Sequence, residues 1–295
     1  MSHFTLVVPE SLARPPRGLE FAARAVESLG EGDVLDLEAE KERCGEVLER
    51  LHATLNPATR QRHTPGSGAV GIALEASPFC HHLERDGVSV VFAGEVSYWP
   101  GHDTMAEAHD AFMRGEEPPV HDDAEWLLDF YQSFSMHANA SDVTEAALRA
   151  LSLVSGPFAF VVFDSLGHRV WAGRDATGAQ PLYWGTTLDG ILMFGTDATK
   201  LDECCNPSVT PFPAGTLFAS SGNTFASFPG ENGWVITGEE QPGRLLSFVQ
   251  SSSPRAGHPW RDIKAVPRIK PDGVLCGAVY RVASEQQLGG GIRGF

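Results

Sequence analysis

Short apolar runs separated by turn residues dominate the middle of this 295-residue chain. Between Leu153 and Asp197, runs of β-branched and aromatic residues alternate with the turn sequences Asp-Ser-Leu-Gly, Asp-Ala-Thr-Gly and Leu-Asp-Gly. The four runs are Phe158–Phe163, Arg169–Ala172, Pro181–Trp184 and Ile191–Phe194. The pattern predicts an antiparallel meander of four consecutive strands in one sheet, which starts sharply after the small residues Ser155-Gly156-Pro157.

Other segments alternate between helical and strand-like patterns. Apolar residues at helical spacing predict helices at Glu20–Leu29, Leu37–Leu55 and Thr104–Met113. Apolar runs predict strands at Phe4–Val8, Val70–Leu74 and Val88–Ala93. We expect Val88–Ala93 and Phe158–Phe163 to be buried central strands of two packed sheets, with Phe4–Val8 beside them. Helices around antiparallel sheets place the chain in the α+β class.

Two segments have the spacing of a helix capping box. Asp122 and Glu125 precede an apolar helical run, and Asp142 and Glu145 repeat this spacing ahead of Ala146–Leu153. The aspartate at such a position accepts hydrogen bonds from the first backbone N–H groups of the helix. Each pair therefore predicts a helix start.

Proline and glycine residues interrupt the chain most densely between Phe228 and Asp262. We therefore predict one domain over residues 1–283, with a Pro/Gly-rich surface insertion at 228–262 and a flexible tail at 284–295. Within the insertion, we expect Trp234–Ile236 to dock on the domain and Ser251–His258 to be mobile.

Composition excludes several classes of protein. A formal net charge of −16 disfavours binding to nucleic acid and to anionic membranes. The longest fully apolar run has six residues, so we expect no membrane insertion. Five cysteines without C-x-x-C spacing, in a chain without a recognisable leader, predict reduced thiols and a cytoplasmic location, with the nucleus left open. The histidines near Cys80, His102 and His121 lack metal-ligand spacing, so we expect neither a metal nor a cofactor.

The central pattern also carries a family resemblance. The matching elements are Gly156-Pro157-Phe158-Ala159-Phe160, Gly173-Arg174-Asp175 with Gly178, Pro181-Leu182-Tyr183 with Gly185, and Phe212-Pro213-Ala214-Gly215-Thr216. In this order they resemble the class II glutamine amidotransferase domain of asparagine synthetases. The resemblance implies an N-terminal-nucleophile (Ntn) type four-layer αββα sandwich of two antiparallel sheets. We expect Arg174 and Asp175 to stabilise the fold and not to act in catalysis.

A second resemblance extends over nearly the whole chain. Pro267-Arg268-Ile269, Asp272-Gly273-Val274 and Cys276-Gly277-Ala278 are similar to the terminal signature of the aluminium-induced, stem-specific proteins of plants. Those proteins are stand-alone relatives of the amidotransferase domain. Their usual Tyr-Gly-Leu and Leu-Arg-Asp-Arg motifs are missing here, so the chain resembles a divergent member.

The resemblance implies where a glutamine site would lie. The family uses an N-terminal cysteine as nucleophile, and this chain has Ser2 at that place, to be exposed if Met1 is removed. The family's Asn-Gly-Glu element, which stabilises the tetrahedral intermediate, corresponds to Ala93-Gly94-Glu95. The arginine that holds the substrate carboxylate should fall near Ile72–Ala76, where none occurs.

One element of the ligand side matches. Asp123 aligns with the aspartate that holds the substrate ammonium, although it could equally serve the helix start together with Asp122. We take Gly94, Glu95 and Asp123 as ligand-binding candidates, and assign no catalytic residue beyond the weak candidate Ser2.

Three functional hypotheses follow. The first is a catalytically silent amidotransferase-like protein with a binding or regulatory, stress-responsive role, whose ligand is a small amino-acid-like molecule. The second is a weak glutaminase-like amidohydrolase that uses Ser2. The third is an assembly protein that forms homodimers through a sheet edge or through the insertion.

Overall fold

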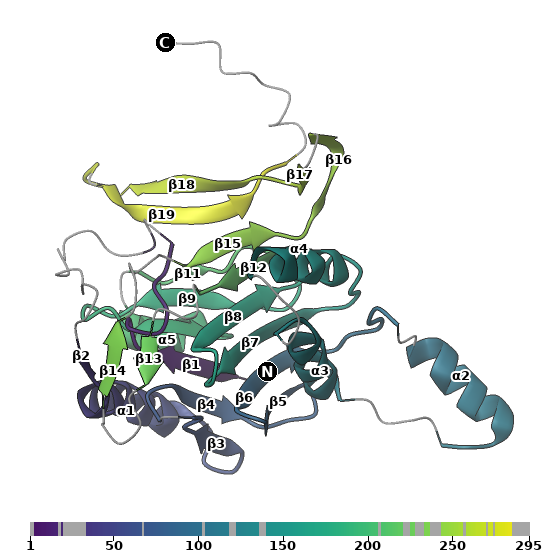
Figure 1. Ribbon diagram of the computed structural model, residues 1–295, viewed down its shortest axis with the longest axis horizontal. Coiled ribbons are helices and arrows are strands. Elements are labelled where there is room, and N and C mark those ends of the chain that lie inside the picture. The colour runs from purple at the N-terminus through teal and green to yellow at the C-terminus, as the bar shows by residue number, and fades with distance from the viewer. Residues whose placement is uncertain are drawn as a thin grey trace, which may run out of the picture.

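Two six-stranded antiparallel sheets lie face to face and helices cover their outer faces (Figure 1). The computed structural model describes residues 3–16, 19, 34–66, 68–101, 104–117, 122–135, 140–205, 208–220, 225–227, 233–236, 243–255, 258–269, 271–273 and 275–284. The first sheet has the order β11 (Thr210–Pro211), β9 (Tyr183–Thr186), β10 (Leu192–Gly195), β1 (Phe4–Val8), β4 (Gly71–Glu75) and β3 (Arg60–His63). The second has the order β15 (Arg244–Ser247), β12 (Thr216–Ala219), β8 (Arg169–Arg174), β7 (Phe158–Asp164), β6 (Val88–Gly94) and β5 (Cys80–Arg85).

The helices complete a four-layer arrangement. Helices α1 (Leu37–Thr54) and α5 (Ala198–Cys205) pack on the first sheet. Helices α3 (Asp123–Ser135) and α4 (Ala140–Leu151) cover the second sheet. Helix α2 (Thr104–Arg114) stands away from the layers (Figure 1). The predicted αββα sandwich is thus confirmed. Among the described residues, no helix is long and apolar enough to cross a membrane.

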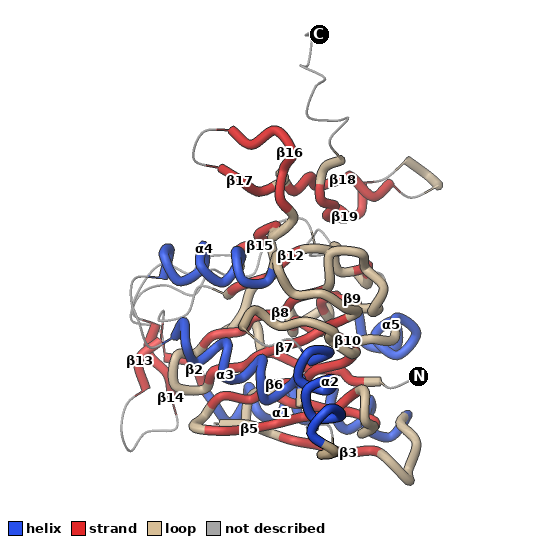
Figure 2. The backbone as a smooth tube through the Cα atoms, turned by 90° about the vertical axis from the view of Figure 1, so that its right-hand side faces the viewer, coloured by secondary structure: helices blue, strands red, loops and turns tan. Residues whose placement is uncertain are grey.

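Smaller strand groups lie at the periphery. Strands β13 (Phe225–Ser227), β14 (Gly233–Ile236) and β2 (Val34–Asp36) form a three-stranded sheet. Strands β16 (Gln250–Arg255) and β17 (His258–Trp260) pair with each other, as do β18 (Ile263–Ile269) and β19 (Leu275–Val282), and both pairs lie at one end of the molecule (Figure 2).

The largest core lies between the two sheets and is rich in aromatic rings. Trp184 is fully buried there and contacts Phe194, Phe212 and Phe218 with ring centroids 4.8 to 6.2 Å apart. Two further cores lie under the helices, one beneath α1 and α5 and one beneath α3 and α4. Aromatic pairs at these distances contribute beyond the area that they bury.

The prediction of four consecutive strands in one sheet is wrong. Strands β7 and β8 pair in the second sheet, whereas β9 and β10 pair in the first. Between them, the buried carboxylate of Asp175 accepts hydrogen bonds from the N–H groups of Thr177, Ala179 and Gln180, and this loop carries the chain across to the facing sheet. The apolar pattern could not separate the two arrangements, because strands of both sheets are buried on both faces.

The other strand and helix predictions have mixed outcomes. Val88–Ala93 and Phe158–Phe163 are buried central strands, as predicted, but they are neighbours in one sheet, and β1 lies in the facing sheet instead of beside them. The helix predicted at Glu20–Leu29 lies outside the described residues. The capping role of Asp142 is wrong because α4 already begins at Ala140, and an N-cap residue must precede the first helical residue.

The segment 228–262 is more regular than the sequence predicted. Its strand β15 is the edge strand beside β12, and Phe248 is buried under α4 in the core of the second sheet. Trp234–Ile236 belongs to β14, whose backbone pairs with β2 and β13. Of the segment Ser251–His258, the described residues 251–255 belong to β16, and His258 begins β17. The mobility of that segment and the limits of the domain stay predictions.

Two histidines meet where the edges of the sheets face each other. His63 on β3 lies opposite Ile72, and His82 on β5 lies opposite Val91, so both rings point into the space between the sheets. Their centroids are 4.1 Å apart. Burial, with a smaller contribution from the charge of His63, lowers the pKa of His82 to about 4, and burial also lowers the pKa of His63.

We therefore predict that the free energy of unfolding decreases as the pH falls from about 6.5 to about 4. In this range the unfolded chain binds protons that the folded protein does not, and this favours the unfolded state. Urea unfolding at several pH values measures the effect. The double variant His63→Gln/His82→Gln should show a weaker dependence, whereas His109→Gln, at an exposed position, should keep the wild-type dependence. Equal slopes in all three proteins would contradict the prediction.

Candidate functional site

The segment that follows β6 is held against the start of β7 by a close backbone approach. Gly94 has a φ of +127°, and a Cβ atom at this position would lie 2.1 Å from the carbonyl oxygen of Pro157. Gly156 has a φ of +128°, and a Cβ atom there would lie 2.5 Å from the carbonyl oxygen of Glu95. Only glycine fits at either position, because any other residue would be strained and would collide with backbone.

Backbone hydrogen bonds use the donors of this segment. The N–H of Gly94 donates to the carbonyl of Phe79 at 2.9 Å, and the N–H of Glu95 donates to the carbonyl of Pro157 at 2.9 Å. The N–H of Ser97 donates to the carbonyl of Ser155 at 2.8 Å. An oxyanion site needs donors that point at an open position. Those of Gly94 and Glu95 point instead at protein carbonyls, and the Glu95 side chain is exposed.

Asp123 fixes the same segment from the helix side. Its Oδ2 accepts a hydrogen bond from the N–H of Val96 at 3.0 Å, and its Oδ1 accepts one from the Trp99 indole at 2.9 Å. Burial raises the pKa of Asp123, and these two hydrogen bonds act in the opposite direction. Both carboxylate oxygens thus serve the fold, since Trp99 packs in the core under α3.

Asp122 caps the start of helix α3, as its spacing predicted. Its Oδ1 accepts a hydrogen bond from the N–H of Ala124 at 2.8 Å, and it also contacts Nε2 of His81. The two adjacent aspartates therefore have different roles: Asp122 caps the helix, and Asp123 holds the segment after β6.

The remaining predicted positions lie apart or are not described. Ser2 lies outside the described residues. The next residue, His3, lies beside the end of β4, and its carbonyl accepts a hydrogen bond from the N–H of Glu75. The resemblance placed a substrate-binding arginine near Ile72–Ala76. In this strand, Ile72 and Leu74 are buried between the sheets. Nearby, Glu75 forms an ion pair with Lys200 at 3.2 Å.

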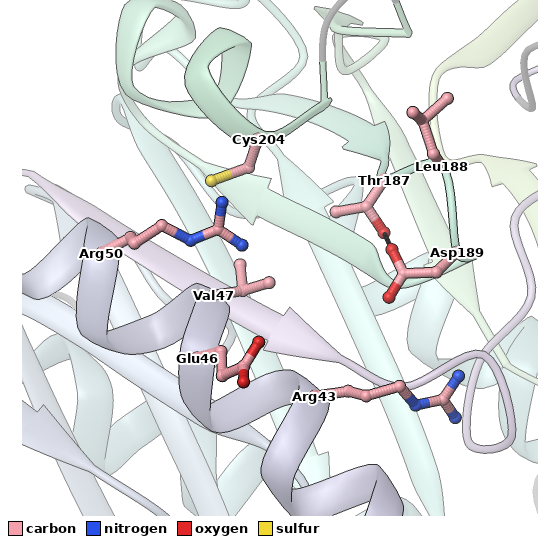
Figure 3. Close-up of a pocket in the computed structure, with 8 residues that line it drawn as sticks. All are labelled: Arg43, Glu46, Val47, Arg50, Thr187, Leu188, Asp189 and Cys204. Carbon is pink, nitrogen blue, oxygen red and sulfur yellow. Dashed lines mark hydrogen bonds between the residues drawn. The ribbon is translucent and has the colours of Figure 1, made fainter.

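A separate cavity of about 210 Å³ lies between α1, α5 and the turn from β9 to β10 (Figure 3). Its charged walls come from both sides: Arg43, Glu46 and Arg50 on α1, and Asp189 on the turn. Figure 3 shows the Arg50 guanidinium extending toward the sulfur of Cys204. Burial raises the pKa of the Cys204 thiol, although the charge of Arg50 acts in the opposite direction, so the thiol is protonated at neutral pH.

Two of these charged side chains already have partners. Arg43 forms an ion pair with Glu40, and the carboxylate of Asp189 accepts a hydrogen bond from the Thr187 hydroxyl at 2.6 Å. The side chains of Glu46 and Arg50 have no hydrogen-bond partner within the part of the chain that the structure describes. Sequence reasoning missed this cavity, and its one visible signal was the spacing of positions 43, 46 and 50 along one helix face.

Comparison with known proteins gives the class to which this arrangement belongs. A probable asparagine synthetase of Dictyostelium discoideum is 27% identical over 182 residues, which cover 61% of this chain and 29% of that protein. The asparagine synthetase of Zea mays is 37% identical over 70 residues, which cover 24% of this chain and 12% of that protein. The chain thus spans less than a third of the length of these relatives.

Two solved structures are similar at lower identity. A glutamine aminotransferase class-II domain protein of Silicibacter pomeroyi has a TM-score of 0.38 and 13% identity, with 84% of this chain and all of that chain covered. The glutamine phosphoribosylpyrophosphate amidotransferase of B. subtilis has a TM-score of 0.42 and 9% identity, with 85% of this chain and 50% of that chain covered.

The chain carries a class II glutamine amidotransferase-like domain related to that of the asparagine synthetases. Within it, residues 143–237 match the family described as aluminium induced protein. The resemblance to the amidotransferase domain is therefore confirmed, and the resemblance to the aluminium-induced proteins is confirmed over residues 143–237.

For this site we predict that Asp123→Asn lowers the free energy of unfolding by about 1 to 3 kcal/mol. A carboxamide has only one acceptor oxygen, so its NH₂ group would face either the Val96 N–H or the Trp99 indole. The matched control is Asp122→Asn, which should cost less than about 1 kcal/mol because asparagine caps helices as well as aspartate does. Urea unfolding at neutral pH measures both, and equal losses in the two variants would contradict a structural role specific to Asp123.

Proposed function

We propose that this protein is a catalytically silent amidotransferase-like protein with a binding or regulatory role. The main observation behind the proposal is that the N–H groups expected to stabilise an oxyanion donate hydrogen bonds to carbonyls of the protein itself. Ala93 has no polar side chain, and the N–H groups of Gly94 and Glu95 donate to the carbonyls of Phe79 and Pro157. Loss of one such donor costs on the order of a hundredfold to a thousandfold in rate.

The substrate side gives further support. The carboxylate of Asp123 binds Val96 and Trp99, so in this chain it is engaged before any ligand ammonium could approach. The strand where an arginine would clamp a substrate carboxylate has none. A bidentate arginine clamp cannot be replaced by apolar side chains. A stress-responsive role is part of this proposal and rests on the family description alone.

We propose the cavity in Figure 3 as the place where a small amino-acid-like ligand binds. A free amino acid carries a carboxylate and an ammonium group. The cavity offers the arginine Arg50, with the carboxylate of Glu46 beside it on α1 and that of Asp189 on the facing turn. Its volume of about 210 Å³ is smaller than the roughly 300 to 1,000 Å³ of pockets for drug-sized ligands, which favours a ligand of few atoms.

We predict no glutamine hydrolysis by the purified protein, measured as ammonia release. Intact mass first establishes whether Met1 is removed. The variant Ser2→Cys, which supplies the more nucleophilic thiol, should stay inactive, because the oxyanion donors remain engaged. Activity in the wild type that Ser2→Ala abolishes would overturn the proposal. A gain of activity in Ser2→Cys would show that only the nucleophile has been lost.

We also predict saturable binding of at least one free amino acid in a calorimetric titration of the full chain against the proteinogenic set. Arg50→Gln should weaken that binding about tenfold or more, since a charged hydrogen bond to the carboxylate is lost. The control Arg149→Gln makes the same change in charge at an exposed position on α4 and should leave the affinity unchanged. Binding that both variants leave intact would place the ligand elsewhere, and a lack of binding would remove this ligand class.

The use of Ser2 by a weak hydrolase and the formation of homodimers stay predictions. Intact mass and sedimentation, respectively, are the measurements that address them.

A further inference from the structure

A second cavity, of about 360 Å³, lies on the opposite side of α1 from the one in Figure 3. Its lining residues come from α1, from β3, from the glycine-rich segment after β3 and from the first residue of β4. They are Lys41, Cys44, Gly45, Leu48, Arg62, Thr64, Gly68 and Gly71. Among the described residues, this lining contains two cationic side chains and no carboxylate.

The positive charge of this cavity is not a consequence of composition. The chain has 38 acidic and 22 basic residues, so a cavity whose described charged side chains are all cationic differs from the average charge of the chain. Arg62 lies opposite Ala73 in the strand register, and Ala73 belongs to the core under α1, so the Arg62 side chain is on the helix side of the sheet. Arg60 lies on the same side, two residues away.

The charges are only partly neutralised. Lys41 forms an ion pair with Glu38 at 2.7 Å, which engages one of the three donors of its ammonium group. The Arg62 side chain has no hydrogen-bond partner among the residues that are described. The pKa of His52, on the next turns of α1, is lowered by burial and then by the charges of Arg60 and Arg62, as expected for a positive local field.

Glycines keep the cavity open. A Cβ atom at Gly45 would meet no other atom within 4 Å, so this position on α1 borders empty space. Gly68 has a φ of +81°, and the Lys41 side chain passes 3.7 Å from where its Cβ would be. Beneath them, Cys44 is buried, and burial raises its pKa to about 12, so the floor of the cavity is neutral at pH 7.

We propose that this cavity binds a small molecule through a phosphate group. Arginine and lysine are the side chains that bind phosphate, the arginine as a planar fork and the lysine as a point charge. Arg62, Lys41 and the Thr64 hydroxyl come from three different elements, which suits a tetrahedral group with several oxygens better than a planar carboxylate. The volume lies within the range of pockets for small metabolites, so the phosphate would be that of a larger molecule.

The test is a calorimetric titration of the full chain with inorganic phosphate, glycerol phosphate and malonate at constant ionic strength. We expect saturable binding of both phosphates, tighter for glycerol phosphate, and weaker or no binding of malonate. Arg62→Gln should weaken phosphate binding about tenfold or more. The control Arg114→Gln, which makes the same change in charge on exposed α2, should change it less than twofold.

A second variant removes the space and keeps every charge. Gly45→Leu places a side chain in the cavity and replaces glycine within a helix, so the unliganded protein should unfold at a temperature at least as high as the wild type does, while phosphate binding is lost. Binding that survives Gly45→Leu or Arg62→Gln overturns the proposal. The proposal is also overturned if malonate binds more tightly than phosphate, or if Arg114→Gln weakens phosphate binding as much as Arg62→Gln does. A lack of saturable phosphate binding by the wild type overturns it as well.

Discussion

The close approach of Gly94 to the backbone of Pro157 determines how the rest of the candidate site is arranged. With no Cβ on Gly94, β6 can end against the first residue of β7, and the chain then turns outward with its N–H groups directed at neighbouring carbonyls. Gly156 makes the reciprocal approach to Glu95. Val96 and Trp99 are thereby brought to the start of α3, where Asp123 binds both. One backbone contact thus connects the second sheet, the segment after β6 and the helix that covers them.

The same contact explains why a resemblance in sequence need not carry a reaction. The Gly-Glu pair at 94–95 and Asp123 are retained in type and position, and sequence comparison alone would count them toward a glutamine site. In the structure each of them has a structural partner: a carbonyl for either N–H group, and two donors for the carboxylate. A buried donor or acceptor that already has a partner gains little from a ligand, because the existing hydrogen bond must first be broken.

Local patterns in the sequence predicted the elements whose burial is simplest. Helix α1 was found from its apolar stripe, β6 and β7 from their continuous apolar runs, and the start of α3 from Asp122. Strands β3 and β5 were missed because polar residues such as Arg60, Arg62, His81 and His82 occupy these sheet edges. The assignment of β8 and β9 to different sheets depends on the Asp175 loop and on pairing with distant β12, and neither is encoded in local periodicity. The partners of Gly94 and Asp123 were hidden for the same reason, since Phe79, Pro157 and Trp99 are distant in sequence.

Helix α1 illustrates how burial can leave two distinct surfaces on one element. Its buried stripe of Cys44, Val47, Leu48 and Leu51 packs on the first sheet, and at 100° per residue this stripe leaves a flank on each side. One flank carries Arg43, Glu46 and Arg50, which face the carboxylate of Asp189 across a cavity with charges of both signs. The other flank carries Lys41 and faces Arg62 across a cavity whose charged side chains, among the described residues, are both cationic. Because the stripe fixes the rotation of the helix, neither set of charges can move to the other side. The two cavities therefore differ in charge for a reason built into the packing of α1, and ligands of different chemistry are expected on its two flanks.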